Sequence, residues 1–334
     1  MMVVLLEIKE KLVQLYGKYE AYMIPMLRFL LGVITFTLIN TNIGYMKVLS
    51  TMPVALILAA LCSVLPVNAM IALAAIVVLL DLYALALEVF IVGVLIFAFI
   101  YFVYYRFSPR YGYNAVLMPV CFKLGIPYAV PIGSGLLGEM YSVVSVVCGS
   151  VIYFFLKGVH ENEATLNSAS DAGTSATSKI TITLNQLLMN KEMFLVIAIF
   201  AIATIVVYII RRLDIDNAWM IAWIAGVLIE IIGLISGYLL LGIPGKVLGV
   251  ILGGGISAVI AWGLQFMFFN VDYTRTERLQ FEDDEYYYYV KAIPKAVVTS
   301  SDKQVKHIHK NDDKERLTKK KFAEEMDIDE ELLN

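Results

Sequence analysis

The distribution of apolar positions predicts a chain that crosses a membrane several times. A helix needs roughly 20 predominantly apolar residues to cross about 30 Å of hydrocarbon. Several runs meet this length, and two shorter runs, separated by Leu65-Pro66, lie between the first long run and the second. We therefore predict about eight transmembrane helices, at 22–43, 52–65, 67–83, 85–105, 140–157, 192–211, 217–240 and 246–269.

Polar positions concentrate at the two ends of the chain. Residues 1–20 carry apolar side chains at helical spacing among charged ones, which predicts an amphipathic helix on the membrane surface. Residues 21–270 form the polytopic transmembrane domain. Residues 271–334 hold 12 Lys or Arg and 16 Asp or Glu, which indicates a small charged tail in water. Tyr286–Val290 and Ala296–Val298 favour β-strands within it.

The composition agrees with an all-α integral membrane protein. The chain is 60% hydrophobic and 16% charged, whereas soluble proteins are about 45–50% apolar and ~25% charged. These values exclude a water-soluble enzyme and a nucleic-acid binder. The cysteines Cys62, Cys121 and Cys148 lie in apolar runs without metal-site spacing, so we expect neither a metal nor a cofactor.

Lysine and arginine positions predict the orientation. Lys9, Lys11 and Lys18 place the N-terminus in the cytoplasm, and the tail is expected there too. The Ser- and Thr-rich segment 159–190 then becomes a solvated extracytoplasmic loop. The number of membrane crossings agrees with this orientation only if residues 112–138 enter and leave the membrane from the same side. The chain lacks an organelle address, so we expect the cell membrane of a bacterium.

Residues 112–138, called the broken segment below, interrupt the helical pattern. Three prolines and five glycines make one continuous helix costly. We predict a re-entrant hairpin, or two short half-helices, that turns around Lys123–Pro127. Broken segments in transporters supply substrate sites, which makes Lys123, Gly133, Ser134 and Gly135 candidate ligands. Two kinked helices packed for structural reasons are the alternative.

Two acidic positions fall in or near predicted spans. Glu230 lies near the middle of 217–240, where a carboxylate costs at least ~2.5–3.5 kcal/mol. One interpretation is a site for a proton, a cation or a cationic group. The other is a buried ion pair with Lys123 or Arg28. Asp81, together with Glu88, is expected to flank a turn in water.

A stripe of small residues runs along 246–269 and just before it. Small side chains at intervals of four let two helix backbones approach closely. The partner helix belongs either to the same chain or to a second copy. The stripe, named below as the small-residue stripe, consists of Gly245, Gly249, Gly253, Ser257 and Ala261.

Catalytic patterns are absent from the predicted spans. All three histidines fall outside them, and neither a zinc-protease helix nor a phosphate-binding loop is present. We therefore expect no enzyme. The first hypothesis is a transporter or permease subunit with its site at the broken segment and Glu230. The alternative is a structural or assembly subunit of an envelope complex, whose tail recruits a cytosolic protein. Solvation around Glu230 discriminates the two.

Overall fold

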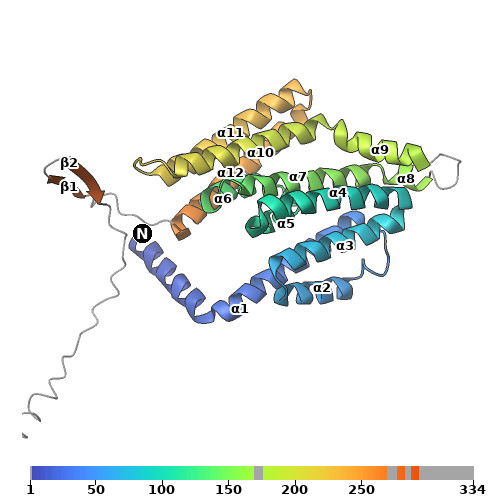
Figure 1. The fold of residues 1–334 in the computed structure, drawn as a ribbon, viewed down its shortest axis with the longest axis horizontal. Helices are drawn as coiled ribbons and strands as arrows, with labels where there is room; N and C mark the ends of the chain where they lie inside the picture. The colour runs from blue at the N-terminus through green and yellow to red at the C-terminus, as the bar shows by residue number, and fades with distance from the viewer. Residues whose placement is uncertain (1, 169–175, 269–276, 283–286, 293–334) are drawn as a thin grey trace, which may run out of the picture. The chain divides into compact units, whose positions relative to one another are not determined.

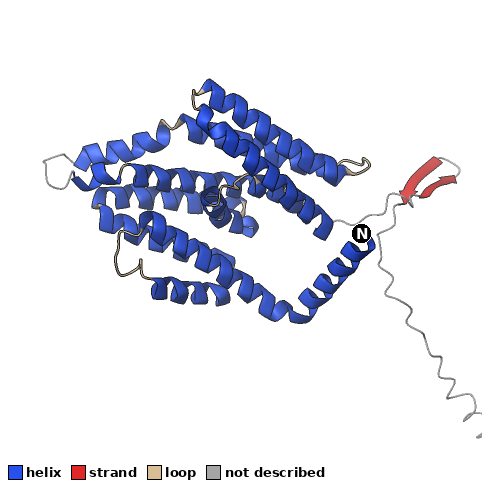
Figure 2. Cartoon of the chain, turned by 180° about the vertical axis from the view of Figure 1, so that it is seen from behind, coloured by secondary structure: helices blue, strands red, loops and turns tan. Residues whose placement is uncertain are grey.

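The computed structural model describes residues 2–168, 176–268, 277–282 and 287–292. In these ranges the chain is helical up to residue 268, and one pair of strands follows (Figures 1 and 2). The helices are α1 (Met2–Ile43), α2 (Met52–Val64), α3 (Val67–Leu85), α4 (Leu87–Phe107), α5 (Tyr113–Lys123), α6 (Ala129–Leu137), α7 (Ser142–Glu161), α8 (Glu163–Ser168), α9 (Ala176–Leu188), α10 (Lys191–Arg211), α11 (Ala218–Leu240) and α12 (Val247–Phe268), with 3₁₀ turns η1 (Pro109–Tyr111) and η2 (Pro244–Lys246).

Seven helices in the described ranges are long and apolar enough to cross a membrane. They are the Gln14–Ile43 part of α1, then α3, α4, α7, α10 and α11, and finally Pro244–Phe268. The chain is therefore a multi-pass membrane protein. The short helix α2 has 13 residues, and at 1.5 Å per residue it spans about 20 Å, less than the hydrocarbon core. An eighth crossing stays a prediction.

A kink divides α1 near the predicted end of the surface helix. Tyr19 has non-helical backbone angles, φ −118° and ψ 20°. Before the kink, Ile8, Leu12 and Leu15 are about half exposed. After it, the residues that face the neighbouring helices become buried, with Phe36 and Ile43 at 1% exposure. The two parts of α1 therefore have different surroundings.

The helices form three neighbouring groups in Figure 1: α1 to α3, then α4, α5 and α7, and finally α10 to α12. The most extensive helix pair is α10 with α11. Glycines permit this closeness, because a Cβ at Gly226 would lie 2.4 Å from Val207, and one at Gly237 would lie 2.4 Å from Leu195. Small residues at a helix contact replace the missing hydrophobic driving force in lipid.

The segment 159–190 is not a simple solvated loop. It contains α8 and α9, and α9 packs against α4 and α7. Ile180 and Leu187 contact the hydrophobic core, and Thr183 is buried. These positions follow helical spacing, which the Ser- and Thr-rich composition hides from a composition-based prediction.

A two-stranded antiparallel hairpin is the β structure in the described residues. It pairs β1 (Glu277–Glu282) with β2 (Tyr287–Ala292), with Leu279 opposite Val290. The strand predicted at Tyr286–Val290 thus exists over most of its length. Its partner precedes it in the chain. The strand predicted at Ala296–Val298, like the rest of the tail, lies outside the described residues.

Candidate functional site

The broken segment consists of two short helices, α5 and α6, joined by a tight turn at Leu124–Tyr128. Gly125 ends α5 in a left-handed conformation, with φ 77°. The Ile126 N–H donates to the Cys121 carbonyl (2.9 Å), and the Gly125 N–H donates to that of Phe122 (3.2 Å). This is the Schellman motif, and Pro127 directly after it prevents the helix from continuing. The turn lies at the position that the sequence predicts.

The same tetrapeptide, Leu-Gly-Ile-Pro, ends α11. Gly242 has φ 72°, and the Ile243 N–H donates to the Tyr238 carbonyl at 2.9 Å. Identical residues thus make the same helix end twice. The turn of the broken segment is therefore a local consequence of its sequence.

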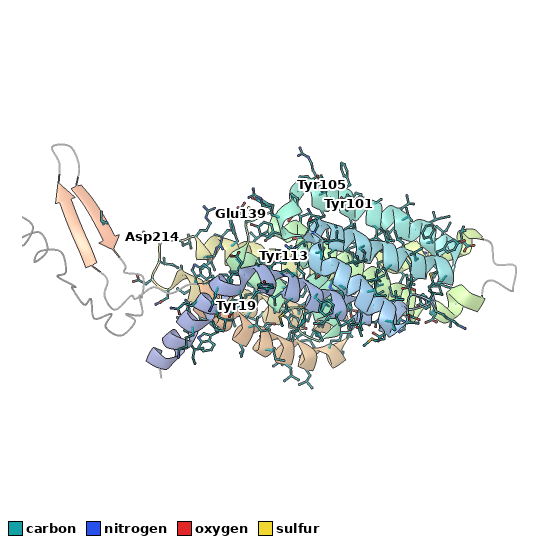
Figure 3. All side chains as sticks on the ribbon, turned by 90° about the horizontal axis from the view of Figure 1, so that it is seen from below. Tyr19, Tyr101, Tyr105, Tyr113, Glu139 and Asp214 are labelled. Carbon is teal, nitrogen blue, oxygen red and sulfur yellow. The ribbon has the colours of Figure 1, made fainter. Side chains whose placement is uncertain are left out.

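The two outer ends of the α5–α6 hairpin lie at the same end of the helices. The rings of Tyr111 and Tyr141 are 5.9 Å apart. Arg211, at the end of α10, donates to the carbonyls of Leu136 and Gly138, the latter at 3.0 Å. Glu139 is exposed and lies at the same end as Asp214 (Figure 3). The chain thus enters and leaves the hairpin at one end, as the orientation analysis requires.

Glu230 is fully buried on the face of α11 that packs against α10. Its side chain is 0% exposed, and neither carboxylate oxygen has a hydrogen-bond partner among the described residues. Gly226 and Gly233 flank it on this face, against Val207 and Ile199 of α10. The antiparallel register of these contacts places the small residue Ala203 level with Glu230. The carboxylate therefore lies between two closely packed helices.

The tip of the hairpin approaches this carboxylate. Tyr128 is buried and lies within electrostatic range of Glu230. Its ring packs edge-on against Phe200, with centroids 6.0 Å apart. The same ring contacts Gly253 of α12, where an added Cβ would lie 2.3 Å from it. The candidate site therefore combines Glu230, the tip residue Tyr128 and the glycine that admits its ring.

The two basic residues suggested as partners of Glu230 lie elsewhere. Arg28 donates to the Leu65 carbonyl at 3.3 Å. Lys123 lines a cavity on the other side of the hairpin, together with Lys157. The buried ion pair of the structural interpretation is therefore not formed. The sequence offers Lys123 as a partner because it lies in the hairpin, but only the rotation of each helix about its axis decides which way each side chain points.

Two of the other candidate ligands of the broken segment, both glycines, lie at helix contacts. A Cβ at Gly135 would lie 2.7 Å from Val207, and one at Gly133 would lie 3.4 Å from Leu264. The two glycines therefore let α6 lie directly against α10 and α12. Ser134 is buried at 3% exposure, and its hydroxyl has no partner among the described residues.

The small-residue stripe divides into two parts. Gly253, Ser257 and Ala261 are buried, and α12 contacts α6 of the same chain. At Gly245 and Gly249 an added Cβ would meet nothing within 4 Å. Within the described residues, the first part of the stripe is thus exposed, and the second part packs against α6.

An ion-pair network lies at the opposite end from Arg211. Glu192, in the first turn of α10, contacts Lys246 at 2.5 Å and Lys157 at 3.6 Å. It also accepts a hydrogen bond from Tyr238. The network joins α7, α10 and α11 to the start of α12. Sequence analysis missed it. The available signal was an acidic residue in a first turn, where the helix dipole favours it.

Asp81 is buried, contrary to the expectation that it flanks a turn in water. It is 0% exposed and accepts a hydrogen bond from the Met46 N–H at 3.0 Å. It thus fixes the loop between α1 and α2. In that loop, burial and the Glu163 carboxylate raise the pKa of Tyr45, whose hydroxyl lies 3.5 Å from Glu163. The predicted spans 67–83 and 85–105 put a turn close to Asp81, which suggested that its side chain lies in water. In the structure α3 and α4 are separated by Ala86 alone.

No group of three or more metal-ligating side chains occurs in the part of the chain that the structure describes. Comparison of the chain with known protein families, curated proteins and solved structures found no match.

Proposed function

We propose that the chain is a transporter or permease-like subunit of the cell membrane, without enzymatic activity, whose N- and C-termini are cytoplasmic. The α5–α6 hairpin is a re-entrant element in this proposal. Glu230 takes up and releases a proton or a small cation when the tip of the hairpin moves. The observation that carries the proposal is a fully buried carboxylate that has no hydrogen-bond partner among the described residues and lies within electrostatic range of Tyr128 at the tip of a broken helix pair.

The energetic cost of this arrangement supports a function. A buried charge without a partner is strongly unfavourable, and the group requires a proton or a cation to offset it. A purely structural role would be served better by an apolar residue of similar volume. Ionisable residues inside membrane segments commonly mark ion pathways and proton relays. The hairpin tip, held by Tyr128 against Gly253, then closes an occluded state of this site.

The alternative is a structural or assembly subunit, and the exposed half of the small-residue stripe favours it. Gly245 and Gly249 leave open space along the first turns of α12 and just before them. Close packing of another membrane helix there would bury a surface that the chain leaves uncovered. The two proposals differ in whether Glu230 is ever reached by water.

Thiol accessibility discriminates these proposals. Cys62, Cys121 and Cys148 are replaced, and single cysteines are introduced as Glu230→Cys and Ser134→Cys. Exposed Glu139→Cys is the reference, and a variant that retains only the fully buried Cys62 is the control. A membrane-impermeant thiol reagent is applied to right-side-out and inverted vesicles.

A transporter opens its site in a minor state of about 0.1–10% population. Glu230→Cys should then be labelled about 10- to 1000-fold more slowly than Glu139→Cys, but faster than Cys62. Labelling of Glu230→Cys and Ser134→Cys no faster than Cys62, from both sides, contradicts the proposal. The structural subunit would then be the better account.

A further inference from the structure

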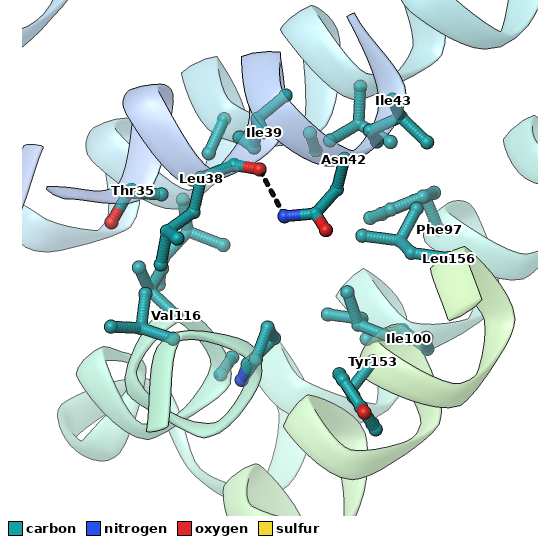
Figure 4. A pocket seen from close by; sticks show the side chains of 18 of the residues that line it. Thr35, Leu38, Ile39, Asn42, Ile43, Phe97, Ile100, Val116, Tyr153 and Leu156 are labelled. Atoms are coloured by element: carbon teal, nitrogen blue, oxygen red, sulfur yellow. Dashed lines mark hydrogen bonds between the residues drawn. The ribbon is translucent and has the colours of Figure 1, made fainter. Parts of the chain in front are cut away.

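A cavity lies on the face of the hairpin that is turned away from Glu230. Its walls come from α1, α3 and α4 on one side and from α5 and α7 on the other. Its volume is about 120 Å³, roughly ten times what a single water molecule needs. Leu38, Ile39, Phe97, Ile100 and Val116 supply apolar surface (Figure 4). A space this apolar does not hold water well, so it calls for an apolar occupant.

The lysine, histidine and asparagine side chains of the cavity gather where three helices end. Lys123 is the last residue of α5, Lys157 and His160 lie in the last turns of α7, and Asn42 lies in the last turn of α1. The lining includes no carboxylate. The Lys157 ammonium group forms ion pairs with Glu161 at 3.8 Å and with Glu192 at 3.6 Å. Lys123 is exposed, lies within electrostatic range of Glu161, and has no carboxylate within 4.0 Å in the described ranges, so its ammonium group is free to contact a further anion there.

The walls of the cavity are long enough for part of an extended hydrocarbon chain. The wall from Thr35 to Ile43 and the wall from Ile152 to His160 each cover eight residue steps, about 12 Å along a helix. The side-chain amide N–H of Asn42 donates a hydrogen bond to the Leu38 carbonyl at 2.6 Å (Figure 4). Its amide oxygen is left to accept a hydrogen bond. The cavity is therefore apolar along its length and cationic where Lys123 ends it.

We propose that this cavity binds one membrane phospholipid with an anionic headgroup. One acyl chain lies along the apolar walls, and a headgroup phosphate oxygen accepts a charge-assisted hydrogen bond from the Lys123 ammonium group. Lys157 and His160 add further donors beside it. The site goes beyond the proposed function, because it involves neither Glu230 nor the face of the hairpin that packs against α10, α11 and α12.

Photocrosslinking in detergent tests the site. The full-length chain is incubated with a phosphatidylglycerol analogue that carries a photoreactive group in one acyl chain, and the crosslinked peptides are mapped by mass spectrometry. Saturable crosslinks to the α1 and α5 residues that line the cavity are expected. Crosslinks confined to other surfaces would overturn the proposal, whatever the variants below show.

Competition and matched variants separate the possible ligands. Lys123→Gln should weaken the apparent affinity about tenfold, because one charge-assisted hydrogen bond is lost. Lys191→Gln, an exposed lysine in the first turn of α10 that does not line the cavity, should leave it unchanged. Unlabelled phosphatidylglycerol should compete, whereas phosphatidylcholine should compete at least tenfold less well.

Three outcomes would reject the phospholipid. They are equal affinity in the Lys123→Gln and Lys191→Gln variants, equal competition by phosphatidylcholine, and full competition by soluble glycerol phosphate. The last would show that the site takes the free anion alone. None of these outcomes depends on the accessibility of Glu230, so the two proposals can fail separately.

Discussion

The two faces of the α5–α6 hairpin are packed in opposite ways. Towards α10, α11 and α12, an added Cβ at Gly135 or Gly253 would lie 2.7 Å or less from a neighbouring side chain. Towards α1, α3 and α4, the hairpin borders a cavity of about 120 Å³. One face therefore holds the hairpin in place. The other face borders an open space in this structure, so a ligand can bind there without first separating helices.

The largest effect should come from adding volume to the tight face at the tip. Gly253→Val places a branched side chain against the Tyr128 ring and the Gly125 carbonyl, and we expect a loss of about 3 kcal/mol from overpacking. Gly249→Val is the matched control on the same helix, with open space around it. Thermal unfolding in detergent measures both. Equal effects would mean that the tip does not pack against α12 in this way.

The next effect concerns the base of the hairpin. Arg211→Ala removes the hydrogen bonds to the carbonyls of Leu136 and Gly138, as well as the contact with the Trp219 ring. We expect a loss of about 2 kcal/mol. Arg212→Ala, which removes an exposed contact to Tyr208, should change stability by less than about 0.5 kcal/mol. The comparison uses the same unfolding measurement. A larger loss of stability for Arg212→Ala would contradict the conclusion that Arg211 holds the base of the hairpin.

The smallest effect compares one added methylene on each face. Val207 contacts both Gly135 and Gly226, so Val207→Ile should cost about 1 kcal/mol or more. Val116 borders the cavity, and Val116→Ile should be neutral or stabilise by up to about 1 kcal/mol. Chemical denaturation of the two variants in the same detergent gives the difference. A penalty at Val116 as large as that at Val207 would show that the cavity face is equally rigid.

Much of the fold follows from local patterns that a sequence displays directly. The apolar runs correspond to the long helices, because hydrocarbon requires every backbone group to be paired within a helix. The turn of the broken segment follows from Leu-Gly-Ile-Pro, which forms the same motif at the end of α11. The depth of Glu230 in its helix was also predictable by counting.

The failures share a different origin. Asp81 was placed in water and is buried, and Glu230 was offered Lys123 or Arg28 as a partner and has neither. The helices in 159–190 were missed, because their apolar positions are interleaved with Thr and Asn. In each case the error concerns the direction in which a side chain points or the element that covers it. Spacing along a single helix does not contain this information.

The sequence by itself determined that the chain is a multi-pass α-helical membrane protein with a break at residues 112–138. Hydrophobicity over 20 residues and the chemistry of Pro and Gly are local properties, so they can be derived without knowing what packs nearby. Only the tertiary structure decided that Glu230 lies within electrostatic range of Tyr128, and that Lys123 faces a cavity on the opposite side. Those placements depend on how each helix is rotated about its axis, which the summed contacts of the surrounding helices set.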